Sequence, residues 1–158
     1  MNGIVLPASA VAIGGRALLI EGPPGSGKSS LALALVDRGA GLIGDDAVTL
    51  TGAGPMLLAS PPPNIAGLLE LRGVGLVTLP VAPPAPVALI LMLGGPPAER
   101  LPDRPLPVRM IAGVAVPQLS FDPGTIAPAP RAEWALRTHG LTFDRSSLCP
   151  HQPPHSSS

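Results

Sequence analysis

The chain has 158 residues, of which 23 are Pro and 19 are Gly, and it holds one Trp, two Phe and no Tyr. Ten Lys and Arg balance ten Asp and Glu, so the formal net charge is zero, which argues against nucleic-acid binding through a broad basic surface. Because 46% of the residues are hydrophobic, general disorder is excluded as well. The length favours a single domain, and the Pro and Gly content favours many loops.

The first part of the chain predicts a strand, a loop, a helix and a second strand. An apolar run at 16–22 indicates a buried strand, and a glycine-rich loop follows it. Leu31 and Leu35 then recur at helical spacing, with Gly39 as a C-terminal cap. Residues 41–50 are typical of another strand, with two acidic residues in its middle. This order of elements predicts an α/β fold.

The second part predicts several short strands and one more helix. Residues 52–63 are interpreted as an excursion that ends at three prolines, and 65–73 fits either a short helix or a strand. Strands are expected at 75–79, at 87–93 and, with a bend, at 108–121, and a proline-rich loop at 94–107. Pro near the start and Gly at the end predict a helix at 130–140, which Trp134 should pack onto the sheet.

Localisation and domain limits follow from the charge and cysteine pattern. Residues 73–98 carry no charge and are long enough to cross a bilayer, but four prolines would interrupt a spanning helix. Residues 1–15 lack the Lys or Arg that opens a secretory signal. Cys149 is the single cysteine, which leaves no disulfide within the chain and no cysteine-cluster metal site. We therefore expect a cytoplasmic protein without membrane association, with one domain at 1–141 and a disordered tail at 142–158.

Residues 22–29, GPPGSGKS, match the phosphate-binding pattern G-x-x-x-x-G-K-[ST] in full, between an apolar strand and a helical pattern. Glycines let successive backbone N–H groups surround a phosphate, and the N-terminus of the following helix adds positive potential. In such loops the lysine, here Lys28 and the only lysine of the chain, reaches the β- and γ-phosphates, and the hydroxyl of Ser29 ligates Mg²⁺. A chance match of a glycine-rich turn is the alternative. The sequence thus predicts binding of ATP and Mg²⁺. The expected nucleotide-binding residues are Gly22, Pro23, Pro24, Gly25, Ser26, Gly27, Lys28, Ser29 and Ser30.

Asp45 and Asp46 interrupt the apolar strand expected at 41–50. Because adjacent residues of a strand point to opposite faces, one carboxylate is expected to face the phosphates. There it can hold Mg²⁺ or take the proton from an attacking hydroxyl. A solvated turn is the alternative, because Gly44 before the pair suits one.

Glu70 and Arg72 lie two residues apart in the segment LELRGVG, and hence on one face if the segment is extended. Glu70 is a candidate second Mg²⁺ ligand, and Arg72 is suited to contact a phosphate with two hydrogen bonds. A surface ion pair before a turn is an equally simple interpretation.

The segments GPPGSGKSSLALALVDRG, LIGDDAV and LELRGVG together resemble the HPr kinase/phosphorylase family over roughly residues 8–120. The resemblance is to the catalytic domain alone, and it implies a P-loop α/β fold with a mixed sheet and flanking helices. It also implies an ATP- and Mg²⁺-dependent protein kinase that phosphorylates a serine of HPr, the phosphocarrier protein of the sugar phosphotransferase system. By the same resemblance, Asp45 and Asp46 supply the catalytic base, and Ser29, Asp46 and Glu70 hold the metal. Longer members are hexamers, so a homo-oligomer is a further expectation.

Three positions depart from the family pattern. Pro7 stands where the family has a His, so the proton-handling role of that His is not carried over. The arginine expected after the strand at 87–93 is best matched by Arg100, which joins the expected catalytic residues, although Arg104 is close. Residues 122–125, Asp-Pro-Gly-Thr, lack both arginines of the family segment that is linked to dephosphorylation. We therefore expect a kinase whose reverse, phosphorylase reaction is weak or absent.

Two other classes of protein stay open. A small-molecule or nucleotide kinase shares the loop and the size, but it usually needs an arginine-rich lid, and the candidate lid at 94–107 holds only two arginines. A nucleotide-sensing regulator that transfers no phosphate is the second alternative, because Pro7 replaces the family His. Phosphate transfer to a protein distinguishes the protein kinase from both.

Overall fold

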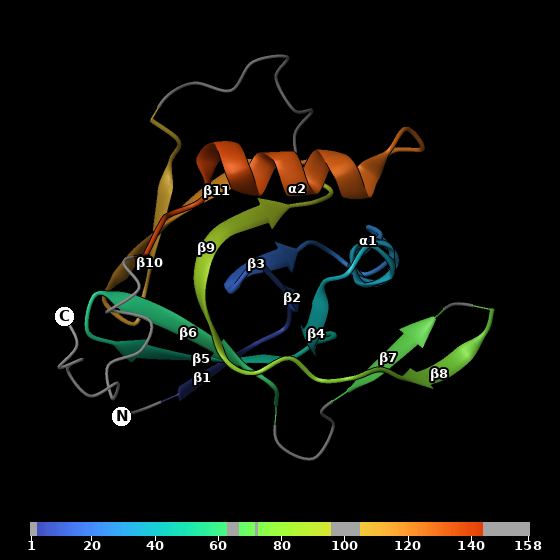
Figure 1. The fold of residues 1–158 in the computed structure, drawn as a ribbon. Helices are drawn as coiled ribbons and strands as arrows, with labels where there is room; N and C mark the ends of the chain where they lie inside the picture. Colours follow the sequence, from blue (N-terminus) through green and yellow to red (C-terminus); the bar gives the residue numbers. More distant parts are fainter. Residues whose placement is uncertain (1–2, 63–66, 72, 96–104, 144–158) are drawn as a thin grey trace, which may run out of the picture.

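A computed structural model describes residues 3–62, 67–71, 73–95 and 105–143 (Figure 1). The elements are, in chain order, β1 (Gly3–Leu6), β2 (Ser9–Ile13), β3 (Arg16–Glu21), α1 (Lys28–Asp37), β4 (Gly41–Gly44), β5 (Val48–Ala53), β6 (Met56–Ser60), β7 (Leu68–Leu71), β8 (Gly75–Thr78), β9 (Ala85–Met92), β10 (Val108–Ile111), β11 (Val114–Ser120) and α2 (Pro128–His139). Figure 1 shows a curled sheet with both helices on one side and the β7–β8 hairpin extending from the body. This is the mixed α/β architecture with flanking helices that the sequence predicts.

The centre of the sheet is the parallel pair of β3 and β9, in which Leu18 lies beside Leu89 and Glu21 beside Met92. Strand β2 is antiparallel to β3 and also pairs with β4, whereas β11 runs parallel to β9. The first residues of β9 pair with β6, which continues through β5 to β1 at the sheet edge. Strand β9 is an almost continuous apolar run because other elements cover both of its faces.

Two apolar clusters lie on opposite faces of the central strands. Alternate residues of β3 point to opposite sides, so Leu18 and Ile20 face the helices whereas Leu19 faces β5 and β6. On the helix side, the expected residues of α1, Leu31 and Leu35, are buried in the cluster. The alternating side chains of β3 therefore pack the helices against one face of the sheet. The glycine-rich loop begins at the residue that directly follows the carboxyl end of β3.

The two helices begin and end close to where the sequence predicts. Gly39 follows α1 at φ 109°, a left-handed conformation that suits glycine after a helix. Helix α2 ends at His139, and the N–H of the following Gly140 donates to Leu136 O. Arg38 joins the helices through two contacts to Glu133, at 3.0 and 2.9 Å. This hydrogen bond and the carboxylate charge raise the pKa of Arg38.

The prediction of a single strand at 41–50 is wrong. Strand β4 ends at Gly44 and β5 begins at Val48, and the two strands pair with different parts of the sheet. The chain turns so tightly between them that a Cβ on Gly44 would lie 2.2 Å from Ala47 O. Asp46 sits in this turn at φ 60°, so the pair of acidic residues belongs to the turn that the sequence left as the alternative.

Two further segments are hairpins. The excursion expected at 52–63 is wrong for most of its length, because β5 and β6 pair up to Ala53 and Met56 around a two-residue turn. The bend expected within 108–121 is a turn at Ala112 and Gly113, both with positive φ, which joins the antiparallel strands β10 and β11. A continuous apolar pattern does not reveal a chain reversal when the turn holds small apolar residues.

The prediction that Trp134 packs α2 onto the sheet is wrong. Its side chain is 62% exposed, and the Arg137 guanidinium lies 4.7 Å from the ring centroid. The buried face of α2 consists of Ala129, Ala132, Ala135 and Leu136. Trp134 is not among these residues, so α2 packs through three alanines and one leucine.

The remaining expectations concern the membrane and the tail. In the described ranges, no helix is both long and apolar enough to cross a membrane. Leu141 donates its N–H to Ala88 O and, with Phe143, packs partly against the helix-side cluster. The rest of the predicted tail, 144–158, lies outside the described residues, as does 96–104 of the predicted loop at 94–107.

Candidate active site

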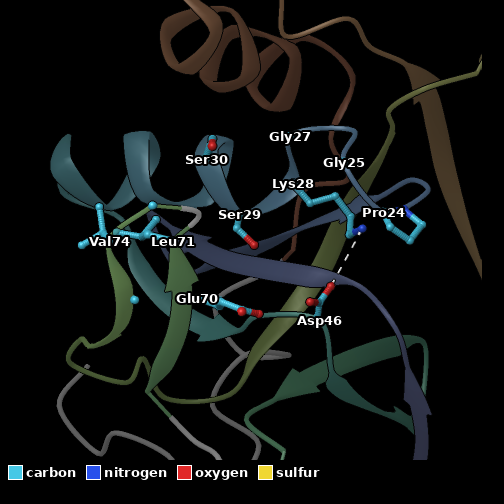
Figure 2. A pocket seen from close by; sticks show the side chains of 12 residues that line it. Pro24, Gly25, Gly27, Lys28, Ser29, Ser30, Asp46, Glu70, Leu71 and Val74 are labelled. Atoms are coloured by element: carbon cyan, nitrogen blue, oxygen red, sulfur yellow. Dashed lines mark ion pairs between the residues drawn. The ribbon is translucent and has the colours of Figure 1, made fainter.

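An open cleft of about 690 Å³ lies between the start of α1 and the β7–β8 hairpin (Figure 2). This volume falls within the range of about 300–1,000 Å³ that is typical of small-molecule sites. Its lining residues are Pro24, Gly25, Gly27, Lys28, Ser29, Ser30, Asp46, Glu70, Leu71, Gly73, Val74 and Gly75. The cleft therefore combines the glycine-rich loop with one residue of the acidic pair and with the Glu70 segment.

The glycine-rich loop has the backbone shape that phosphate binding requires. Gly25 and Gly27 adopt φ 82° and 98°, left-handed values that turn successive N–H groups toward one side. Ser26 N donates to Pro23 O at 3.1 Å, which closes the turn, and α1 begins directly at Lys28. The N-terminus of a ten-residue helix thus opens at the cleft, where it favours an anion.

Lys28 is folded back against the loop that carries it. Its side chain is only 8% exposed, and its Nζ donates to Gly22 O at 2.8 Å. The same ammonium lies 3.9 Å from Asp46 Oδ1. Its Nζ also donates to Pro23 O at 3.4 Å, so the buried cation is held at the cleft by two carbonyls of the loop and by one carboxylate.

Asp45 is fixed by three hydrogen bonds. Its Oδ1 accepts from Ser29 Oγ at 2.6 Å and from Ser9 Oγ at 2.9 Å, and its Oδ2 accepts from Glu70 N at 3.2 Å. The donors come from α1, β2 and β7, so this carboxylate joins three elements that are distant in sequence. Asp45 is half-buried and directed to the serine of the loop.

Asp46 is the more accessible carboxylate of the pair. Its side chain is 66% exposed, it lines the cleft, and Figure 2 shows it directed toward Lys28. The expectation that the two acidic residues point to opposite faces of a strand is wrong. Both residues lie in the turn after β4, where Asp46, at φ 60°, lines the cleft and Asp45 accepts a hydrogen bond from Ser29, which lines it too.

The β7–β8 hairpin forms the wall of the cleft opposite α1. Glu70 lies on β7 with its exposed side chain toward the cleft, and Leu71 and Val74 form an apolar part of the same wall (Figure 2). Strand β7 pairs in register with β8, so the segment is extended as one of its two interpretations expected. The alternative of a surface ion pair between Glu70 and Arg72 stays a prediction, because Arg72 lies outside the described residues.

The donor set of the cleft fits Mg²⁺. Mg²⁺ prefers oxygen ligands and usually keeps several waters beside one or two carboxylates and substrate phosphates. Ser29 Oγ, the pair of acidic residues and Glu70 supply hydroxyl and carboxylate oxygens around one end of the cleft. Among the described residues, no three His, Cys, Asp or Glu side chains come close enough to hold a metal by themselves. A metal here would depend on the phosphates of its nucleotide.

The other predicted residues have different places. Gly22, Pro23 and Ser26 shape the loop without lining the cleft, whereas Ser30 lines it from α1. Pro7 lies exposed in the bend between β1 and β2. Arg100 and Arg104 lie outside the described residues.

Sequence reasoning missed Ser9. Its side chain is fully buried, and its hydroxyl donates to a carboxylate 36 residues away. A lone serine in an apolar strand carries no motif, so only the folded arrangement reveals its partner.

Comparison of the sequence with known proteins points to one family. Residues 4–81 match the HPr Serine kinase C-terminal domain. An HPr kinase/phosphorylase of Bordetella petrii is 46% identical over 66 residues, which are 41% of this chain and 21% of that protein. Another, from Cupriavidus necator, is 42% identical over 80 residues, 50% of this chain and 23% of that protein. The matched stretch therefore spans less than a quarter of these relatives.

A solved structure extends the comparison to most of the chain. The Hpr(Ser) kinase/phosphatase from Coxiella burnetii superposes with a TM-score of 0.74 and 30% identity, over 86% of this chain and 90% of that one. The chain belongs to the HPr kinase/phosphorylase family. Its fold is the catalytic-domain fold of that family, and its coverage fits the C-terminal domain alone, as the motifs predicted. The stretch at 4–81 that matches the HPr kinase/phosphorylase family contains the glycine-rich loop, the pair of acidic residues and Glu70.

Proposed function

We propose that the chain is an ATP- and Mg²⁺-dependent protein kinase that phosphorylates a serine of HPr. The observation that carries the proposal is that Lys28, Ser29 and Asp46 line one cleft, with Asp45 bonded to the Ser29 hydroxyl. Phosphoryl transfer needs a positioned cation, an Mg²⁺ site and a group that orients the attacking hydroxyl, and this cleft offers candidates for all three. A cytoplasmic location and a homo-oligomer are parts of the same proposal.

We assign Ser29 and Asp45 to the binding of Mg²⁺. Their oxygens lie 2.6 Å apart, and Ser9 and the Glu70 N–H hold the carboxylate in place. Glu70 faces the same cleft and is the further candidate ligand. Bound Mg²⁺ would neutralise charge on the β- and γ-phosphates. The sequence placed Asp46 on the metal, whereas the contact with Ser29 favours Asp45 for that role.

Asp46 is the residue that we assign as the base. Its carboxylate is open to the cleft, whereas both oxygens of Asp45 already accept hydrogen bonds. In the proposed reaction, Asp46 accepts the proton of the serine hydroxyl as that oxygen forms a bond to the γ-phosphorus. The bond from the γ-phosphorus to the bridging oxygen breaks, ADP leaves, and Lys28 stabilises the charge on the phosphoryl group.

The deciding experiment follows labelled γ-phosphate from Mg-ATP to purified HPr. We expect phosphoserine on HPr, and we expect Lys28→Ala to lower the rate by about 10²–10³-fold, the usual cost of removing one donor that stabilises transition-state charge. Trp134→Ala is the control, since that side chain is exposed on α2. Tight ATP binding without transfer would favour the nucleotide-sensing regulator. Transfer to a small molecule but not to HPr would favour the small-molecule kinase.

The roles of the two acidic residues are tested by matched amide variants. Asp46→Asn should lower kcat while the Mg²⁺ dependence stays as in the wild type, because only the proton acceptor is lost. Asp45→Asn should raise the Mg²⁺ concentration needed for half-maximal rate. The reverse pattern would exchange the two assignments.

We also propose that the phosphorylase direction is weak. Residues 122–125, which lie between β11 and α2, carry no arginine, and the carboxylate of Asp122 accepts from Gly124 N within the same segment. A phosphate ion therefore finds no arginine of this segment to bind. Release of the phosphoryl group from phospho-HPr by inorganic phosphate should be much slower than the forward reaction, and comparable rates would contradict this.

A further inference from the structure

The segment between β11 and α2 lies against the phosphate-binding loop. A Cβ built on Gly27 would be 3.7 Å from Cγ of Pro123, so the proline ring borders the space beside the last glycine of the loop. Gly27 precedes Lys28, and its left-handed backbone helps to direct N–H groups to the cleft. Pro123 therefore borders the loop that is proposed to hold ATP.

Little within the segment itself fixes it in this position. Asp122 Oδ1 accepts from Gly124 N at 3.1 Å, which shapes one local turn. Ala127 adopts φ 43°, a left-handed value that is unfavourable for a residue with a Cβ, and no side chain caps the start of α2. A strained segment of this kind persists only where other contacts hold it.

Arg131, one turn into α2, supplies those contacts. Its Nη2 donates to Pro123 O, and its Nε donates to Ile126 O at 2.9 Å. Its guanidinium also lies 5.0 Å from the centroid of the Phe121 ring, at the end of β11. One planar group thus ties both ends of the segment to the helix, which the fork of an arginine allows and a lysine does not.

We propose that Arg131 is a positioning residue for the nucleotide. It holds Pro123 beside Gly27 and thereby keeps the phosphate-binding loop in its closed shape without touching the phosphates. This inference rests on the proposed function as far as ATP is the ligand. It goes beyond the family motifs, because Arg131 lies outside all three of them.

The test measures the affinity for Mg-ATP by calorimetry in the full chain, beside the melting temperature and the KM and kcat of transfer. Arg131→Met should weaken Mg-ATP binding and raise KM for ATP by about five- to tenfold. It should change kcat less than KM, with a melting temperature close to that of the wild type. Arg131→Lys should not rescue affinity, since one ammonium cannot replace the fork. Arg137→Met is the matched control, because that arginine stacks on the exposed Trp134 of the same helix.

A second variant acts beside this glycine directly. Pro123→Ala removes the ring beside Gly27 while Arg131 stays in place, and it should weaken Mg-ATP binding in the same direction. Wild-type affinity in both Arg131→Met and Pro123→Ala would overturn the inference, and so would a loss that only follows loss of folding. If the wild type binds Mg-ATP without phosphorylating HPr, the proposed function fails while the affinities still test Arg131. A wild type that does not bind Mg-ATP would overturn both.

Discussion

At the scale of single residues, the site depends on one carboxylate that three elements hold. Asp45 accepts from Ser9 on β2, from Ser29 on α1 and from the Glu70 N–H on β7. Each hydrogen bond restricts the orientation of the Asp45 carboxylate, so its position does not depend on a bound metal. Preorganisation of this kind lets a polar group act without reorganising during the reaction.

Ser9→Ala tests this arrangement. A hydrogen bond to a charged group contributes about 1.5–3 kcal/mol, so we expect the Mg²⁺ needed for half-maximal transfer to rise by about tenfold or more. The measurement is a Mg²⁺ titration of the rate at saturating HPr. Ser60→Ala is the control, since the Ser60 hydroxyl donates to a backbone carbonyl in β5, at 3.4 Å. An unchanged Mg²⁺ dependence in Ser9→Ala would show that Asp45 keeps its position without Ser9.

At the scale of elements, the tight turn between β4 and β5 is what gathers the acidic residues. A strand through 41–50 would place their side chains on opposite faces, whereas the turn puts Asp46 in the cleft and Asp45 within hydrogen-bond distance of Ser29. Gly44 permits the turn, because a Cβ there would meet Ala47 O at 2.2 Å.

Gly44→Ala should therefore damage both stability and transfer. Overpacking a tight site costs about 1–3 kcal/mol, and the shift of the Ala47 carbonyl would move Asp45 and Asp46 together. Chemical denaturation measures the first effect, and the rate of transfer at a temperature where the variant is folded measures the second. Gly95→Ala is the matched control, because a Cβ there meets no atom within 4 Å. Equal stability of the two variants would contradict the steric argument.

Helix α2 offers a second test at this scale. Trp134 is 62% exposed and Leu136 is 1% exposed, although the sequence favoured the tryptophan as the packing residue. Leu136→Ala should lower the free energy of unfolding by about 2–5 kcal/mol. Trp134→Ala should lower it by less than about 1 kcal/mol, the contribution of an exposed stacking contact. A larger loss for Trp134→Ala in urea denaturation would contradict the observed packing.

At the scale of the whole molecule, the main curled sheet carries the glycine-rich loop and the β4–β5 turn, and the separate β7–β8 hairpin joins them through the hydrogen bond from Glu70 N to Asp45 (Figure 1). A ligand that binds this cleft therefore stabilises the folded chain as a unit. At a concentration one hundred times its Kd, such a ligand adds about 2.7 kcal/mol to the free energy of unfolding.

Saturating Mg-ATP should accordingly raise the melting temperature by roughly 5–10 °C. Lys28→Ala should abolish most of this shift, whereas Trp134→Ala should keep it. Differential scanning calorimetry with and without Mg-ATP makes the measurement. An equal shift in the wild type and in Lys28→Ala would place the nucleotide outside this cleft.

The sequence alone determined the elements whose signals are local. The apolar run at 16–22, the glycine-rich loop and the spacing of Leu31 and Leu35 lie within a few residues of one another, and all three features are confirmed in the fold. The combined motifs also identified the family, because their order and spacing are specific even where each motif is weak.

The tertiary structure alone decided the features that join distant residues. Neither the bond from Ser9 to Asp45 nor the exposure of Trp134 has a local signature, since the first joins residues 36 positions apart and the second depends on which face of α2 the rest of the chain covers. The brace from Arg131 to the segment beside Gly27 is of the same kind. Local patterns record what neighbouring residues prefer, whereas packing selects among those preferences through contacts that the order of residues does not display.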